Sequence, residues 1–137
     1  MKKGGYFLIS AILAGVDLGV KEYVERHKEK FSVHHNKGFS KNRLDDRREI
    51  VSAVSAGMTT AIALGIGMSG DKKGVDLEKL GWAVVLGGAL SNTFDRLKRK
   101  FVVDYIPLGR YIYNLGDFFI YTGAIIAAAV NFFGKDD

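Results

Sequence analysis

The longest uncharged stretch of the sequence runs from Ile50 to Gly70 and contains no Asp, Glu, Lys or Arg. A helix needs about 17–25 predominantly apolar residues to cross a bilayer. A helix in a soluble bundle would instead carry polar residues at helical spacing along its outer face, and this stretch offers only Ser, Thr and Gly. It therefore predicts a transmembrane helix.

Three further apolar runs have a similar length. We expect an all-α polytopic membrane protein with four transmembrane helices, at about 5–20, 50–70, 77–94 and 114–133, in a single domain of residues 1–137. Lys2 and Lys3 precede the first run, as in a cleaved signal sequence. The three later runs and the lack of a clear small-x-small cleavage site favour a retained span.

Composition and charge argue against several classes of function. The 20 basic residues are interspersed with 15 acidic ones, so the net charge of +5 is too modest and too dispersed to indicate nucleic-acid binding. The chain has no cysteine, which excludes disulfides, thiolate catalysis and cysteine-ligated metal.

The loops after the first and third predicted helices contain short patterns typical of strands. FSVHHNKGFS, residues 31–40, alternates loosely, and VVDYI, residues 102–106, reads as a short strand followed by Pro107, the only proline. With four spans these two loops lie on the same side of the membrane. Trp82 and Tyr105 fit an aromatic belt at the membrane interface.

The pattern N-x-x-D occurs twice, as Asn92 to Asp95 and as Asn114 to Asp117. Each Asn and Asp share a helix face, and antiparallel neighbours bring the two acids to similar depth. A charge within a span costs about 2.5–3.5 kcal/mol, which indicates a function. Two close carboxylates share one proton, as in aspartic proteases. Alternatively, Asp95 pairs with Arg96 at the interface and Asp117 is a helix-start acid.

Two segments carry a family resemblance. GGALSNTFDRLKRKFVVDYI, residues 87–106, and YNLGDFFIYTG, residues 113–123, together resemble the signature of signal peptidase II, the bacterial family of four-helix membrane aspartic proteases that process lipoproteins. The resemblance extends to Asp17 and Lys21 in DLGVK and to Asn36 and Gly38 in NKGF. Ser91 and Gly116 depart from the family pattern, which has Gly and Ala there.

The resemblance implies roles for these residues. Asp95 and Asp117 are expected to be the catalytic dyad, and Asp104 is expected to hold the surface strands to the helices. Supporting or substrate-binding residues are expected at Asn36, Gly38, Asn92, Arg96 and Asn114. Asp17 and Lys21, spaced as i and i+4, are expected to form a structural ion pair.

The resemblance also implies an activity and a location. The family removes the signal peptide from diacylglyceryl-modified prolipoproteins just before the lipidated cysteine, without a metal or cofactor. A small extracytoplasmic β-cradle from the first and third loops would hold the substrate. We expect a monomer in the bacterial cytoplasmic membrane, in contact with membrane lipids. The alternatives are a noncatalytic paralogue of the same fold that binds lipoproteins or lipids, and a small transporter.

The basic residues conflict with this orientation. The family orientation places 14 Lys and Arg residues outside and six inside, whereas short cytoplasmic loops normally carry the excess. We retain the family orientation because Lys2 and Lys3 directly precede the first span.

Overall fold

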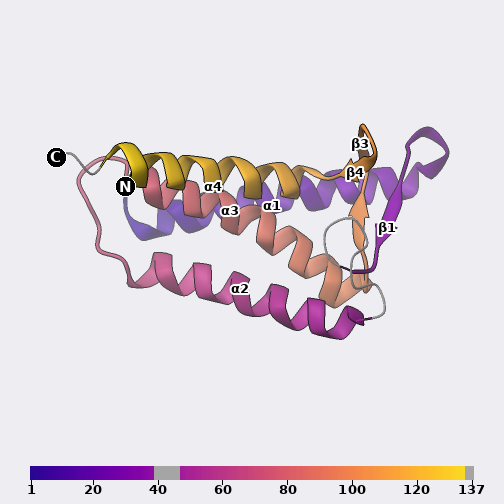
Figure 1. The fold of residues 1–137 in the computed structure, drawn as a ribbon, viewed down its shortest axis with the longest axis horizontal. Helices are drawn as coiled ribbons and strands as arrows, with labels where there is room; N and C mark the ends of the chain where they lie inside the picture. The colour runs from indigo at the N-terminus through magenta and orange to yellow at the C-terminus, as the bar shows by residue number, and fades with distance from the viewer. Residues whose placement is uncertain (39–46, 135–137) are drawn as a thin grey trace.

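The computed structural model of the chain describes residues 1–38 and 47–134. The described residues form four α-helices, α1 (Lys3–Arg26), α2 (Arg48–Met68), α3 (Leu77–Phe94) and α4 (Leu115–Phe133), close to the four predicted ranges. α3 contacts the other three helices, and the N-terminus and the end of α4 lie opposite the strands (Figure 1). By length and composition, two of the described helices, α2 and α4, are apolar enough to cross a membrane.

α1 is longer than predicted. It was expected to end near residue 20 because a run of charged residues begins at Lys21, but the helix continues to Arg26. Lys21 and Val24 belong to the buried face of the helix, and Glu22 pairs with Arg26 one turn later at 2.9 Å. The segment also lacks a glycine or proline that would end the helix.

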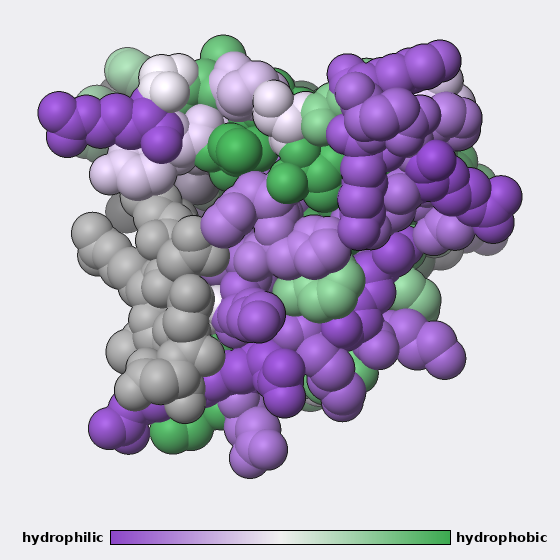
Figure 2. Space-filling view, turned by 90° about the vertical axis from the view of Figure 1, so that its right-hand side faces the viewer, coloured by the Kyte–Doolittle hydropathy of each residue, from purple (hydrophilic) through white to green (hydrophobic). Residues whose placement is uncertain are grey.

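Short strands connect the helices at one end of the molecule. β1 (His34–Asn36) pairs antiparallel with β2 (Val102–Asp104), and β3 (Ile106–Leu108) forms a hairpin with β4 (Tyr111–Tyr113). A first-loop strand therefore pairs with a third-loop strand, as expected. Figure 2 shows this end face on, with a mainly hydrophilic surface.

Two details of the strand predictions differ from the structure. Pro107 lies within β3, opposite Ile112, rather than after the strand. Proline is tolerated in strands only where its missing N–H is not needed, as at an edge. The strand-like first-loop segment contributes only the three residues of β1, and its last residues, Phe39 and Ser40, lie outside the described ranges.

A wide helical turn leads from α3 into β2. The residues after Phe94 form a π-helix, η4 (Asp95–Arg99), in which the Lys100 N–H donates to the Asp95 carbonyl at 3.0 Å. Lys100 has φ +71°, a left-handed conformation that is unfavourable for residues other than glycine. This turn redirects the chain so that β2 passes back over the ends of the helices.

The interior is divided into two apolar clusters. Tyr6, Ile66 and Leu86 pack together near the termini, and Val24, Val103 and Tyr105 pack beneath the strands. Large apolar side chains also cover the outside of the bundle. Leu8 is 61 % exposed, Ile125 68 % and Phe132 78 %. Water-soluble monomers rarely expose so much apolar surface, whereas a lipid-facing surface requires it.

α3 and α4 approach each other through glycines. A Cβ atom added at Gly81 would lie 2.7 Å from the Gly123 carbonyl oxygen and 2.8 Å from the Ala127 nitrogen. Both neighbours are backbone atoms, which cannot move aside without moving the helix. Small residues permit this kind of close packing between helices in membranes.

We therefore expect Gly81→Ala to lower the melting temperature in detergent, with a loss of about 1–3 kcal/mol typical of overpacking. Gly19→Ala in α1 is the matched control, because an added Cβ there meets no atom within 4 Å. The control should melt at the wild-type temperature or slightly above it, since Ala favours helices over Gly. Equal melting temperatures for the two variants would contradict the close α3–α4 contact.

Candidate active site

A cavity of about 410 Å³ lies at the strand end of the bundle, between α2, α3, α4 and β2. One part of its wall is apolar and includes Met58, Val85 and Ile120. The polar part is formed by residues that the sequence singled out: Asn36, Asn92, Arg96, Asp104 and Asp117. The structure thus brings residues from four separate segments of the chain to one cavity.

Asp117 lies in the first turn of α4 and forms a capping box with Asn114. The Asn114 side chain accepts from the Asp117 N–H at 2.8 Å, and Asp117 Oδ2 accepts from the Asn114 N–H at 3.1 Å. Asp117 Oδ1 accepts from Asn92 Nδ2 at 3.2 Å. Asp117 is therefore a helix-start acid, as the alternative interpretation predicted, and it also faces the cavity. The two N–H donors orient its carboxylate.

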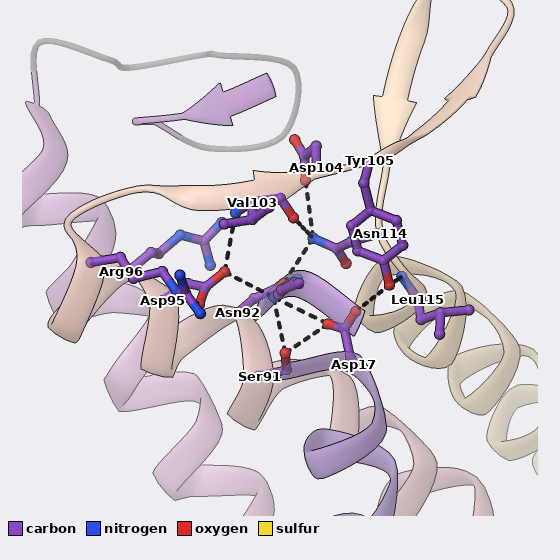
Figure 3. Close-up of polar contacts among 12 residues, drawn as sticks. Asp17, Ser91, Asn92, Asp95, Arg96, Val103, Asp104, Tyr105, Asn114 and Leu115 are labelled. Atoms are coloured by element: carbon purple, nitrogen blue, oxygen red, sulfur yellow. Dashed lines mark hydrogen bonds and ion pairs between the residues drawn. The ribbon is translucent and has the colours of Figure 1, made fainter. Parts of the chain in front are cut away.

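Asp104 ends β2 and lies on the same cavity wall, only 4 % exposed. Asn114 Nδ2 donates to Asp104 Oδ1 at 2.9 Å and also lies 3.1 Å from Asn92 Oδ1, so this amide connects the strand to α3 (Figure 3). Burial, and after it the negative charge of Asp117, raise the pKa of Asp104 from 3.8 to about 7. Asp104 can therefore hold a proton near neutral pH.

The structure places Asp95 elsewhere. Its side chain is fully buried, does not line the cavity and is enclosed by three donors. Asp95 Oδ2 lies 3.0 Å from Lys21 Nζ and accepts from the Val103 N–H at 3.0 Å, and Arg99 Nε donates to Oδ1 at 3.0 Å. The carboxylate that shares the cavity with Asp117 is therefore Asp104, not Asp95 as expected.

Lys21 is the centre of a buried polar cluster. Its ammonium lies 3.1 Å from Asp17 Oδ2, so the expected ion pair is present, but it is fully buried. The same ammonium donates to Ser91 Oγ at 2.9 Å and to Asn92 Oδ1 at 3.0 Å. Through Asn92, the cluster fixes one of the donors to Asp117.

The sequence did not predict that two further residues, Tyr105 and Ser91, belong to this cluster. Tyr105 was assigned to an interfacial belt, but it is buried and its hydroxyl donates to Asp17 Oδ1 at 2.7 Å. Burial and this hydrogen bond raise the pKa of Tyr105, which keeps the hydroxyl protonated. Ser91 donates to Asp17 Oδ2 at 2.6 Å. In the sequence, only the departure from the family pattern at Ser91 indicated that this residue differs from its counterparts.

Arg96 reaches the cavity from η4 and is supported by α2. Its Nη1 donates to Ser55 Oγ at 2.9 Å, and the hydroxyls of Ser55 and Thr59 lie 2.7 and 2.9 Å from that of Thr93. These hydroxyls join α2 to α3 beside the cavity.

The remaining predicted residues come from the first loop. Asn36 lines the cavity from β1, and its Oδ1 accepts from the Gly38 N–H at 3.1 Å. Within the described ranges, no group of three or more His, Asp or Glu side chains is arranged to hold a metal ion.

Comparisons with known proteins agree on a family. The family described as "Signal peptidase (SPase) II" matches residues 9–133. A "Lipoprotein signal peptidase" of Xanthomonas axonopodis pv. citri is 36 % identical over 89 residues, covering 57 % of this chain and 52 % of that protein. Proteins of the same name from Serratia proteamaculans and Caldicellulosiruptor bescii are 43 % and 38 % identical over 61 and 52 residues. These matches cover 41 % and 37 % of this chain.

The matched part of the chain spans about a third to a half of the length of these curated relatives: 52 %, 36 % and 35 %. Solved structures extend the likeness to the whole fold. A bacterial membrane enzyme solved by the in meso method superimposes with a TM-score of 0.80 at 18 % identity, covering 96 % of this chain and 89 % of that one. A second such structure gives 0.75 at 18 % identity, with 98 % and 95 % covered. Since the family match extends over most of the sequence, the chain belongs to the signal peptidase II family.

Proposed function

We propose that the chain is an aspartic endopeptidase that cuts diacylglyceryl-modified prolipoproteins just before the lipidated cysteine. The observation that carries this proposal is that a buried carboxylate, Asp104, and a half-buried one, Asp117, line one cavity. The names of the relatives supply the substrate class. We assign the catalytic dyad to Asp104 and Asp117, and a structural role to Asp95.

The hydrogen bonds suggest different tasks for the two acids. Asp117 receives an N–H group on each oxygen, which orients both oxygens, and we assign it the role of general base. Asp104, with its pKa near 7, is protonated for much of the time at neutral pH and suits a general acid.

In the proposed reaction, Asp117 takes a proton from a water molecule as the water oxygen attacks the scissile carbonyl carbon. Asp104 gives its proton to the carbonyl oxygen, and a gem-diol forms. In the second step Asp104 takes a proton from one hydroxyl of the gem-diol as the C–N bond breaks, and Asp117 gives its proton to the leaving nitrogen. A new carboxyl group and a free amine result, and the dyad returns to its starting state. Such proton transfers contribute about 10²–10⁴-fold each.

Neighbouring side chains would hold the dyad and the peptide. Asn92 and Asn114 orient the carboxylates through the hydrogen bonds described above. Arg96 and Asn36 line the cavity and carry side-chain N–H donors, and we assign them to binding the backbone carbonyls of the substrate. The β1–β2 sheet would act as the cradle, with Gly38 at its end fixing Asn36.

We further propose four membrane spans in a single domain of residues 1–137. α1 and α3 carry charged residues, but Asp17, Lys21 and Lys79 are buried inside the bundle. The outer faces of these two helices can therefore remain apolar. The mainly hydrophilic strand end then lies at the outer surface of the bacterial cytoplasmic membrane (Figure 2). Because the cavity is formed within one chain, a monomer suffices for activity.

Cleavage of a diacylglyceryl-modified prolipoprotein in detergent tests the dyad. We expect Asp104→Asn and Asp117→Asn to lose at least about 10²-fold in rate, because each removes one proton-transfer group. Asp71→Asn, the same substitution at an acid that lies outside the cavity, should cut like the wild type. Cleavage by Asp104→Asn at the wild-type rate would refute the assignment, and a wild type that binds substrate without cutting would indicate the noncatalytic paralogue.

Asp95→Asn should act on stability instead. Removing one charge of a buried ion pair costs about 3–5 kcal/mol because the partner charge is left uncompensated. Thermal unfolding in detergent should therefore show a clear drop in melting temperature, while the folded fraction still cuts. A variant with normal stability and no activity would instead show that Asp95 is a catalytic residue.

The pKa of Asp104 predicts how stability depends on pH. Between about pH 4 and 7 the folded protein keeps this proton while the unfolded chain loses it, so stability should fall as pH rises through this window. Melting temperatures of Asp104→Asn should show a shallower fall over the same window. Identical slopes for the variant and the wild type would show that Asp104 ionises normally.

A further inference from the structure

A second cavity lies at the other end of the bundle. It has a volume of about 540 Å³ and is formed by α2, α3 and the segment that joins them, where the two helices separate (Figure 1). Ile62 lines both this cavity and the active-site cavity, so the two meet along α2. We refer to the second cavity as the α2–α3 wedge.

The inner wall of the wedge is apolar. Ile62, Gly65 and Ile66 face it from α2, and Trp82, which is 40 % exposed, faces it from α3. A Cβ atom added at Gly65 would meet nothing within 4 Å, so this part of the wedge is open. Water needs several polar partners to occupy a cavity stably, and this wall has few to offer. An acyl chain is the chemistry that fits such a wall in a bilayer.

The rim of the wedge carries charges of both signs. Lys72, Asp76, Glu78 and Lys79 contribute two ammonium and two carboxylate groups. The Lys79 ammonium is buried and donates to the Gly70 carbonyl at 2.7 Å, whereas Lys72 is 73 % exposed and lies 3.8 Å from Asp76. A rim with no net charge and one accessible ammonium complements a zwitterionic headgroup, which pairs a phosphate with an ammonium.

We propose that the α2–α3 wedge binds one zwitterionic phospholipid, with an acyl chain against Ile62, Ile66 and Trp82 and the phosphate at Lys72. This inference rests on the membrane placement proposed above. The bound chain would reach Ile62 and so form part of the floor of the active-site cavity. The lipid would also fill the gap that separates α2 from α3.

Trp82 provides a direct test, because it is the only tryptophan in the sequence. Phosphatidylcholine with brominated acyl chains, titrated into the full chain in detergent, should quench its fluorescence saturably at a low lipid-to-protein ratio. Gly65→Leu, which fills the wedge, should lose most of this quenching. Gly57→Leu is the matched control, since it lies on α2 in equally open space but outside the wedge, and it should behave like the wild type.

The headgroup is tested separately. Lys72→Ala should shift the titration to higher lipid concentrations, and Lys73→Ala, an exposed neighbour that does not line the wedge, should not. Quenching that never saturates, or that is equal in the Gly65→Leu and Gly57→Leu variants, overturns the proposal. Quenching relieved by an added prolipoprotein also overturns it, because the wedge would then bind the signal peptide of the substrate.

Cleavage measured on the same samples separates this proposal from the proposed activity. A wild type that cuts but shows no saturable quenching refutes only the lipid site. A wild type that shows saturable quenching but does not cut refutes only the peptidase. Saturable quenching that is lost in Gly65→Leu supports the lipid site whatever the cleavage rate.

Discussion

The candidate active site depends on the buried ammonium of Lys21. A charge without contact with water is tolerated only when excellent geometry compensates its desolvation, and Lys21 has two carboxylates, a hydroxyl and an amide oxygen within 3.1 Å. These partners belong to α1, α3 and η4, so the cation fixes three elements to one another. It also binds Asp95, which leaves Asp104 as the acid beside Asp117 in the cavity. The electrostatics of the interior therefore decide which acids are available for chemistry.

Much of the fold could be predicted from the sequence, and the site only in part. Hydropathy identified all four helices, and the motifs identified the family, because both are encoded locally along the chain. Of the two asparagines in the N-x-x-D patterns, Asn92 lines the cavity, and Asn114 lies buried beside it, bonded to Asn92, Asp104 and Asp117. The spacing could not indicate that α3 gives way to a π-helix at Asp95, or that β2 returns Asp104 to the same wall. Helical periodicity describes one element at a time, whereas the second acid reaches the cavity on a strand.

The departures from the family pattern meet at a single carboxylate. Ser91 donates to Asp17 Oδ2, and a Cβ atom at Gly116 would lie 2.8 Å from the same oxygen. Read in the sequence, the two positions appear as unrelated small-for-small changes 25 residues apart. In the structure they share one neighbour, so the absence of a side chain at Gly116 leaves room for the oxygen that Ser91 holds. The effects of substitutions at Ser91 and Gly116 on the free energy of unfolding are therefore expected to be non-additive.

The pairing of β1 with β2 has a consequence for how the protein acquires activity during synthesis. Asp104 lies opposite His34 in the sheet, and it receives a hydrogen bond from Asn114, which caps the last helix. Contacts between segments so distant in the chain form late, because long loops must close first. The two acids of the proposed dyad therefore come together only when α4 has taken its place beside β2. In the proposed mechanism, a partly synthesised chain that lacks α4 holds only one of the two acids and is an inert precursor.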